Sequence, residues 1–304
     1  MIDVVNLTKR FGSNEAVSAL SFTINKGEIF GIVGPDGAGK STLLRLMATV
    51  LMPDSGSVII KDVNVHDHPY VIKKNLAYMP QRFGLYEDMT VEENIYFFGR
   101  LFGLSKTDVK KREKRLYEFS RLEPFKDRLA GNLSGGMKQK LGLACCLVHS
   151  PEIILLDEPT NGVDPVSRRE FWKILYDLLA EGVTIVVSTS YLDEAERCNR
   201  VAMMYRGRFI TSGTPQKVKN SMKGKFVELA TTNPLASEIL LKDVDEFKGI
   251  ILTGKSLRLF VNDIQEAKLL IASILQKHKI DVLSIKEKLP SLEDCFVDIV
   301  VKGA

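Results

Sequence analysis

The sequence predicts an α/β domain with a largely parallel sheet, followed by a small α+β domain. Three observations support this prediction. Apolar stretches with strand character alternate with helical stretches in the first part of the chain, residues 1–218. The polar segment 217–225 has no apolar periodicity and separates this part from residues 225–304. The total of 304 residues is enough for two domains of roughly 150 residues each.

In the first part, strands and helices are expected to follow one another along the chain. Strands are expected at residues 2–7, 18–24, 28–33, 57–65, 76–79, 153–156 and 183–188. Helices are expected at residues 40–51 and 165–180, and residues 88–129 have mostly helical patterns. Asp164 is a good N-cap before Pro165, and Gly182 suits the end of that helix. This alternation implies parallel strands with ligands at their carboxyl ends.

Residues 225–304 have the pattern strand–helix–strand–strand–helix–strand–helix. The strands are expected at 226–230, 249–252, 257–261 and 280–285. The turn Thr253–Ser256 indicates a hairpin between the middle pair. Ser291 and Asp294 form a capping-box pattern before the last helix, which has Leu292, Phe296 and Ile299 on one face. The order is typical of a ferredoxin-like α+β domain, and it contains no catalytic constellation.

Composition excludes several classes of protein. The 42 Lys and Arg residues nearly balance 38 Asp and Glu residues, and this net charge of +4 is too small to indicate binding of nucleic acid. The basic stretch Lys110–Arg115 is interpreted as a solvated helix face. No stretch reaches the roughly 18 apolar residues of a membrane helix, and the N-terminus does not resemble a signal peptide. We therefore expect a soluble protein that reaches a membrane only through a partner.

The four cysteines have no metal-ligand spacing. They are Cys145, Cys146, Cys198 and Cys295. We expect buried, reduced thiols in a cytosolic protein.

A glycine-rich turn lies between the strand expected at 28–33 and the helix that begins at Lys40. Its pattern, G-x4-G-K-[ST], is made by Gly34, Pro35, Asp36, Gly37, Ala38, Gly39, Lys40, Ser41 and Thr42. The glycines let backbone N–H groups turn inward toward a phosphate, and the helix N-terminus adds partial positive charge. We expect Lys40 to reach the β- and γ-phosphates of a nucleotide and the Ser41 hydroxyl to bind Mg²⁺.

A second motif is the apolar strand 153–156 followed by Asp157 and Glu158. Alone, such an ending is more often structural. Together with the phosphate loop upstream, it predicts that Asp157 holds Mg²⁺, directly or through water. Glu158 is then expected to polarise the attacking water as a general base.

A third motif lies before that strand in the sequence. It consists of Leu133, Ser134, Gly135, Gly136, Met137, Lys138 and Gln139. LSGG-x-x-Q at this spacing resembles the nucleotide-binding subunit of ABC transporters, over about residues 2–218. The resemblance implies a P-loop ABC ATPase cassette with a mixed sheet core, antiparallel strands and a helical subdomain at about 88–140. It also implies that two cassettes enclose two ATP molecules, each between one phosphate loop and the partner's signature.

Other positions match the family one by one. Phe11 matches the aromatic residue that stacks on adenine, although it could also be a core phenylalanine. Gln81 matches the glutamine that links Mg²⁺ and water to the membrane subunit, and Asp164 matches the loop that crosses the dimer interface. The helical subdomain matches the one whose groove receives a coupling helix from a multi-spanning permease.

One position departs from the family pattern. Ser190 stands where family members usually have a histidine that contacts the γ-phosphate and orients the water and the glutamate. In one reading this chain's own site hydrolyses ATP slowly, and a partner cassette with the histidine does most of the turnover. In the other reading, Ser190 or a water substitutes and the subunit works as an ordinary homodimer. Asp36 is a smaller departure, because many members have asparagine there.

Four stretches of sequence indicate a subfamily within the ABC transporters. They are residues 27–35, 78–81, 191–196 and 290–294, which resemble ABC-2-type exporters of drugs, antibiotics and similar substrates. The resemblance implies a peripheral subunit held at the cytoplasmic face of the cell membrane by a permease. Two alternatives stay open: a non-transport ABC ATPase and a regulatory ATP sensor. The C-terminal domain could stabilise a dimer or regulate it.

Overall fold

The computed structural model describes residues 2–221, 225–247 and 249–303. Contacts divide the chain into two compact units, Met1–Pro215 and Gln216–Ala304. Helix α8 (Pro215–Asn220) occupies the start of the polar segment 217–225, whose sequence has no apolar periodicity. Residues 222–224 of that segment lie outside the described residues.

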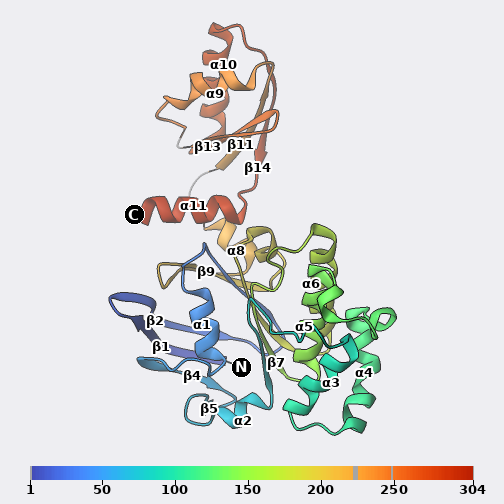
Figure 1. The fold of residues 1–304 in the computed structure, drawn as a ribbon. Coiled ribbons are helices and arrows are strands. Elements are labelled where there is room, and N and C mark those ends of the chain that lie inside the picture. The colour runs from blue at the N-terminus through green and yellow to red at the C-terminus, as the bar shows by residue number, and fades with distance from the viewer. Residues whose placement is uncertain (1, 222–224, 248, 304) are drawn as a thin grey trace. The chain divides into compact units, whose positions relative to one another are not determined.

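The first unit contains two sheets (Figure 1). In the larger one the strand order is β10-β9-β3-β8-β7-β6; β10 is antiparallel and the other neighbours are parallel. Its strands are β3 (Ile29–Val33), β6 (Leu76–Met79), β7 (Ile153–Asp157), β8 (Thr184–Thr189), β9 (Arg200–Tyr205) and β10 (Arg208–Gly213). The antiparallel sheet has the order β2-β1-β4-β5, with β1 (Ile2–Phe11), β2 (Asn14–Ile24), β4 (Ser55–Ile60) and β5 (Val63–Asn64).

Helices cover the larger sheet and form a subdomain beside it. They are α1 (Lys40–Met47), α2 (Pro69–Lys73), α3 (Val91–Leu101), α4 (Lys106–Ser120), α5 (Gly135–Leu147), α6 (Pro165–Ala180) and α7 (Leu192–Ala195), with 3-10 turns at Glu123–Phe125 and Ala130–Asn132. Helices α3, α4 and α5 pack on one another. Figure 1 shows them on the side of the sheet away from β1 and β2.

The central strands are apolar because both faces of the sheet are covered. Every residue of β3, β7 and β8 is buried, as expected for parallel strands between helical layers. Helix α1 contributes Leu43, Leu44, Leu46 and Met47 to the same core. The polar residues at and after the carboxyl ends of these strands therefore lie at the edge of a buried sheet.

Several predicted elements differ in extent, and β1 and β2 are both longer than the strands predicted at 2–7 and 18–24. The helix predicted to run to Leu51 ends at Met47, and Thr49 then adopts a left-handed backbone with φ of 58°. The strand predicted at 57–65 is two strands, because Lys61 and Asp62 have φ of 50° and 64° and form a tight turn between β4 and β5. Apolar residues resume at Val63, so the prediction of one strand passed over the two adjacent polar residues that form the turn.

The second unit has the antiparallel order β12-β13-β11-β14, which is the arrangement of a ferredoxin-like sheet. Its elements are β11 (Lys225–Thr231), α9 (Pro234–Lys242), β12 (Ile250–Thr253), β13 (Ser256–Val261), α10 (Ile264–Lys277), β14 (Val282–Lys288) and α11 (Leu292–Gly303). The predicted capping box before α11 is confirmed. The Ser291 backbone N–H donates to Asp294 Oδ2 (2.6 Å), and the Asp294 N–H donates to Ser291 Oγ (3.2 Å).

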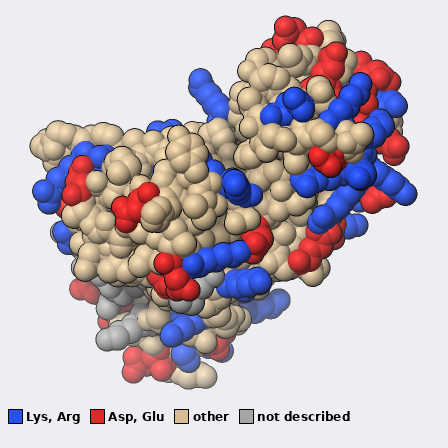
Figure 2. Space-filling view, turned by 90° about the horizontal axis from the view of Figure 1, so that it is seen from below, with Lys and Arg blue, Asp and Glu red and all other residues tan. Residues whose placement is uncertain are grey.

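The basic stretch on α4 is a solvated helix face, as predicted. Lys110 pairs with Glu92 (3.4 Å) and Glu113 (2.7 Å), and Arg115 pairs with Glu181. On the face that Figure 2 presents, Asp and Glu side chains lie among those of Lys and Arg.

All four cysteines are free and buried. Burial raises the pKa of the Cys146 thiol to about 12. Among the described residues, no helix combines the length and the apolar character that a membrane span requires.

A buried asparagine holds the segment between β6 and α3. Asn94 is fully buried, and its side-chain oxygen accepts the Tyr86 N–H (3.0 Å). Its Nδ2 group donates to the backbone oxygens of Tyr86 (3.0 Å), Met89 (3.3 Å) and Thr90 (2.9 Å). These contacts fix the chain that leads from Gln81 into the helical subdomain.

Asn94→Leu should lower the free energy of unfolding by about 2–4 kcal/mol, because several buried backbone groups lose their partner while the volume stays similar. Urea denaturation followed by circular dichroism measures the change. Asn14→Leu, at an exposed position, is the matched control and should be close to neutral. Equal stability of the two variants would contradict the structural role of Asn94.

Candidate functional site

The phosphate loop joins β3 to α1 and depends on its glycines. A Cβ atom at Gly34 would lie 2.1 Å from the Met204 backbone oxygen, and one at Gly39 would lie 2.1 Å from that of Ala16. Gly37 and Gly39 also have positive φ angles of 78° and 107°. Only glycine fits such positions without strain. Asp36 is exposed on the outside of the loop.

Lys40 begins α1 and is only 4% exposed. Its Nζ donates to the backbone oxygens of Gly34 (2.7 Å) and Pro35 (3.1 Å), so the ammonium folds back over the loop. It also lies 3.0 Å from Glu158 Oε1. The lysine is thus held at the mouth of the loop by carbonyls and by a buried carboxylate.

Asp157 ends β7 and is fully buried. Its Oδ1 accepts hydrogen bonds from Ser41 Oγ (2.8 Å) and Ser188 Oγ (2.7 Å), and its Oδ2 accepts one from the Tyr78 hydroxyl (3.3 Å). Burial, and next the charge of Asp157, raise the pKa of Tyr78 to about 12. The phenol therefore stays protonated and donates.

Glu158 follows in a left-handed backbone conformation with φ of 47°. Its N–H donates to the Ser188 backbone oxygen (3.1 Å) and to Ser188 Oγ (3.0 Å). Its Oε2 accepts hydrogen bonds from Gln81 Nε2 (3.0 Å) and Asn161 Nδ2 (3.2 Å). Glu158, Lys40 and Gln81, which sequence reasoning selected separately, therefore meet at one point.

Sequence reasoning missed three neighbours of the two carboxylates: Tyr78, Asn161 and Ser188. A signal for two of them was present. Tyr78 and Ser188 lie near the carboxyl ends of strands that flank β7, where polar residues of parallel strands converge. Asn161 lies three residues after Glu158, and only the observed turn shows that its side chain comes back.

Ser190 is exposed, and its hydroxyl forms no hydrogen bond to the residues that the structure describes. The chain beside it is firmly held. Glu194 is fully buried and accepts hydrogen bonds from Thr160 Oγ1 (2.5 Å) and Thr189 Oγ1 (2.8 Å). Arg168 Nε lies 3.5 Å from Glu194 Oε1 and brings a compensating positive charge.

The signature residues lie at the start of α5. Ser134 is the exposed N-cap and accepts the Met137 N–H (3.3 Å), while Gly135 is exposed and Gly136 is buried. A Cβ at Gly136 would lie 2.5 Å from the Ser167 side chain, so α5 begins tightly against α6. Leu133 is buried and Gln139 half-buried.

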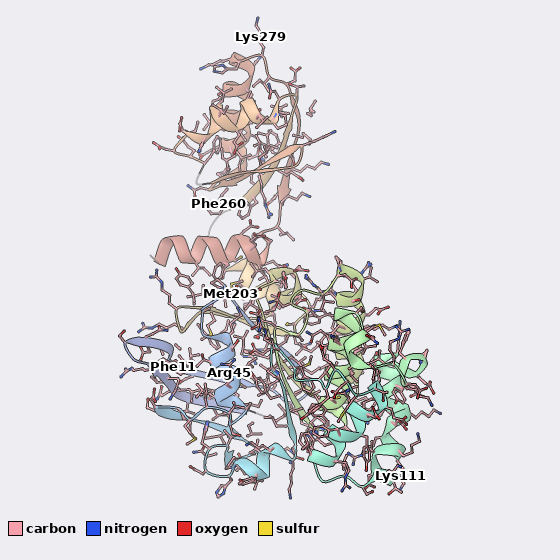
Figure 3. All side chains as sticks on the ribbon, viewed as in Figure 1. Phe11, Arg45, Lys111, Met203, Phe260 and Lys279 are labelled. Atoms are coloured by element: carbon pink, nitrogen blue, oxygen red, sulfur yellow. The ribbon has the colours of Figure 1, made fainter. Side chains whose placement is uncertain are left out.

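Asp164 is the exposed N-cap of α6 and accepts from the N–H groups of Val166 (3.0 Å) and Ser167 (2.9 Å). No hydrogen bond joins the signature, residues 133–139, to the phosphate loop anywhere in the described part of the chain. Phe11, labelled in Figure 3, ends β1 with 50% of its surface exposed and Lys9 Nζ 5.8 Å from its ring centroid. It is therefore not a core phenylalanine.

The donor set of the loop suits Mg²⁺ held together with a phosphate. Ser41 and Asp157 present a hydroxyl and a carboxylate oxygen side by side, which are the hard ligands that Mg²⁺ prefers. No group of three or more His, Cys, Asp or Glu side chains among the described residues could hold a metal ion without other ligands. Substrate phosphates commonly complete a Mg²⁺ site of this kind.

Comparison with known families agrees with this geometry. Residues 17–161 match the ABC transporter family, and residues 213–300 match the C-terminal domain of DrrA1-3-like ATP-binding proteins.

Two similar proteins carry names that specify transport. The probable multidrug ABC transporter ATP-binding protein YbhF of Escherichia coli (strain K12) is 41% identical over 98% of this chain, and the chain spans 52% of that relative. The Nod factor export ATP-binding protein I of Rhizobium sp. (strain N33) is 35% identical over 97% of the chain and 95% of its own length. The chain thus spans about half of the first relative and almost all of the second.

Solved structures include matching cassettes. An ATP-binding subunit of an ABC transporter is 28% identical with a TM-score of 0.65, over 73% of this chain and 92% of its own. A dimeric ATP-binding cassette in a post-hydrolysis state, bound to ADP and Pi, is 27% identical with a TM-score of 0.64, over 70% and 98%. With its fold and sequence matched in this way, the chain belongs to the ABC transporter family and has a C-terminal domain of the DrrA1-3-like type.

Proposed function

We propose that this chain binds ATP with Mg²⁺ and hydrolyses it to power an ABC-2-type membrane exporter. The observation that carries the proposal is the convergence of three segments. The group consists of Lys40 and Ser41 from the loop, Asp157 at the end of β7 with Glu158 directly after it, and Gln81 after β6. Each of them lies within 3.0 Å of a partner in this group.

In this proposal the loop residues 34–42 bind the phosphates of ATP. The α1 N-terminus supplies N–H groups and partial positive charge, and the Lys40 ammonium, now held by two loop carbonyls, moves onto the β- and γ-phosphates. Phe11, exposed at the end of β1, stacks on adenine. Bound Mg²⁺ would be held by Ser41 and Asp157, with Gln81 nearby, and would neutralise developing charge on the phosphates.

Glu158 is proposed as the general base that accepts a proton from the attacking water. Once Lys40 turns to the phosphates, Glu158 Oε1 loses the contact that now occupies it. Gln81 and Asn161 keep donating to Oε2, so the carboxylate retains its orientation. Gln81 thereby connects the base to the chain that enters the helical subdomain.

The signature Ser134, Gly135 and Gly136 is proposed to act on the ATP of a second cassette. Ser134 and Gly135 are exposed at the start of α5, where helix N–H groups can face a γ-phosphate of another molecule. Asp164, exposed at the start of α6, would lie in the same dimer interface. A homodimer or a heterodimer completes the sites.

Export is supported by the relatives, whose names specify multidrug transport and Nod factor export. We infer that the groove of the helical subdomain receives a coupling helix of a multi-spanning permease, which holds the subunit at the cytoplasmic face of the membrane. ATP-driven closure of two cassettes then moves the permease, and hydrolysis reopens them.

We further infer that hydrolysis at this chain's own loop is slow. Family members usually place a histidine where Ser190 lies, and a serine hydroxyl is too short to make the same contact with a γ-phosphate. Loss of one preorganised donor costs about 10²–10³ in rate. A partner cassette with the histidine would then do most of the turnover, aided by this chain's intact signature.

Lys40→Ala should weaken ATP binding by about 10- to 100-fold, because the phosphates lose their charged partner. Titration with a fluorescent ATP analogue measures the dissociation constant. Lys140→Ala, which removes another buried lysine paired with Glu170, is the control and should leave binding unchanged. Equal affinity of Lys40→Ala and the wild type would overturn the assignment of the loop.

Glu158→Gln should remove the general base and trap an ATP-bound dimer, detected by size-exclusion chromatography with ATP. We expect at least a roughly 10²-fold lower hydrolysis rate than in the wild type. Glu113→Gln, at another buried glutamate paired with Lys110, is the matched control. Because the wild-type rate is proposed to be low, the same change is also made in the Ser190→His variant. An unchanged rate of hydrolysis in that faster background would exclude Glu158 as the base.

Ser190→His should raise steady-state Mg-ATPase activity of the purified chain severalfold from a low starting rate. Ser212→His places the same imidazole on another exposed serine and should have no effect. A wild type that already hydrolyses ATP at an ordinary rate, with no gain from either variant, would leave a conventional homodimeric ATPase and refute the slow site.

A further inference from the structure

The carboxylate of Asp157 accepts a hydrogen bond from each of the two neighbouring strands. β7 lies between β6 and β8 in the sheet, with Asp157 directly opposite Ser188 and Leu155 directly opposite Tyr78. Residues opposite each other in register, and residues two apart along a strand, point to the same face of a sheet. Tyr78, Asp157 and Ser188 therefore share the face that α1 covers.

Each neighbouring strand supplies one hydroxyl to a different oxygen. Ser188 donates to Oδ1 at 2.7 Å, and Tyr78 donates to Oδ2 at 3.3 Å. With both oxygens held, the carboxylate cannot rotate about its last bond without losing a charge-assisted hydrogen bond. Asp157 and Ser188 are fully buried, so water cannot replace the bond between them.

These two hydroxyls differ from that of Ser41. Ser41 belongs to the phosphate loop and is expected to touch the metal itself. Ser188 and Tyr78 come from strands, and they act on the metal position through their hydrogen bonds to Asp157. Partners of this kind orient a ligating side chain, and their loss commonly costs 10- to 100-fold in metal affinity.

We propose that Ser188 and Tyr78 are positioning residues, which orient Asp157 for the Mg²⁺ that accompanies ATP. The inference rests on the proposed function, because it needs Asp157 to hold that metal. Ser188 has a second effect, since its hydroxyl also accepts the Glu158 N–H at 3.0 Å. The Ser188 side chain thus orients the Asp157 carboxylate for the metal, and it also holds the backbone of Glu158, the proposed base.

The alternative is that the hydroxyls only satisfy a buried carboxylate, which is a matter of stability. Metal affinity separates the two possibilities. Mn²⁺ replaces Mg²⁺ as a probe, and electron paramagnetic resonance of free Mn²⁺ gives its dissociation constant for the full chain saturated with a non-hydrolysable ATP analogue. Affinity for that analogue without metal, and the urea unfolding midpoint, are measured in parallel.

Ser188→Ala and Tyr78→Phe should each raise the Mn²⁺ dissociation constant about tenfold or more. Binding of the analogue without metal should stay unchanged. Tyr78→Phe keeps the ring, so it provides a second test if Ser188→Ala folds poorly.

Two matched controls remove comparable hydroxyls. Thr184→Val deletes a buried hydroxyl at the amino end of β8, where it accepts the Gly27 N–H. Tyr117→Phe deletes a phenol that donates to the buried Glu113. Both should lower stability and leave Mn²⁺ affinity as in the wild type.

The outcomes are distinguishable. A wild type that binds neither the nucleotide nor Mn²⁺ would refute the proposed function. A wild type that binds both, with variants that bind Mn²⁺ equally tightly, would refute only the positioning roles. Weakening of Mn²⁺ binding by the controls to the same degree would show a general effect of lost stability and would also refute the inference.

Discussion

Lys40 forms a buried ion pair with Glu158, which follows a second buried carboxylate, Asp157, at the end of β7. The neighbouring strands and loops are arranged so that each of these charges has partners. Lys40, Asp157 and Glu158 are 4%, 0% and 7% exposed. A buried charge is costly unless it is paired and hydrogen-bonded. The required partners come from three strands and the segments that follow them: the loop after β3 supplies carbonyls, β8 supplies Ser188, and β6 and the turn after it supply Tyr78 and Gln81. A shift of any of these strands would leave a charge without a partner.

The left-handed backbone at Glu158 allows two consecutive carboxylates to lie on the same side of the sheet. Neighbouring side chains on a strand point to opposite faces, yet Asp157 contacts Ser41 and Glu158 contacts Lys40, which are adjacent at the start of α1. β7 ends at Asp157, and the left-handed turn at Glu158 brings its side chain to the same side. Such a conformation costs roughly 1–3 kcal/mol in a residue other than glycine. Two acceptors from Ser188 hold the Glu158 N–H and help to offset that cost.

Most of the order of strands and helices, and the phosphate loop, could be predicted from sequence because apolar periodicity and a glycine-rich motif are local signals. The strands β9 and β10 were not predicted, and neither was the turn at Lys61 and Asp62, because apolar residues resume directly after that polar pair. The roles of Tyr78 and Asn161 depend on which strands become neighbours and on how the chain bends after Glu158. The sequence therefore indicated which residues carry charge at the site, whereas these two partners depend on the folded structure.

The buried Glu194 has a consequence for how this protein can change during evolution. Through Thr160 and Thr189 it fixes the course of the chain on both sides of position 190, and none of these contacts involves the side chain at 190 itself. The exposed side chain there is therefore uncoupled from folding. A substitution at position 190 is therefore expected to leave the fold unchanged and to need no compensating changes elsewhere. If position 190 acts in hydrolysis as proposed, a single substitution there would add or remove a catalytic group while the fold stays the same.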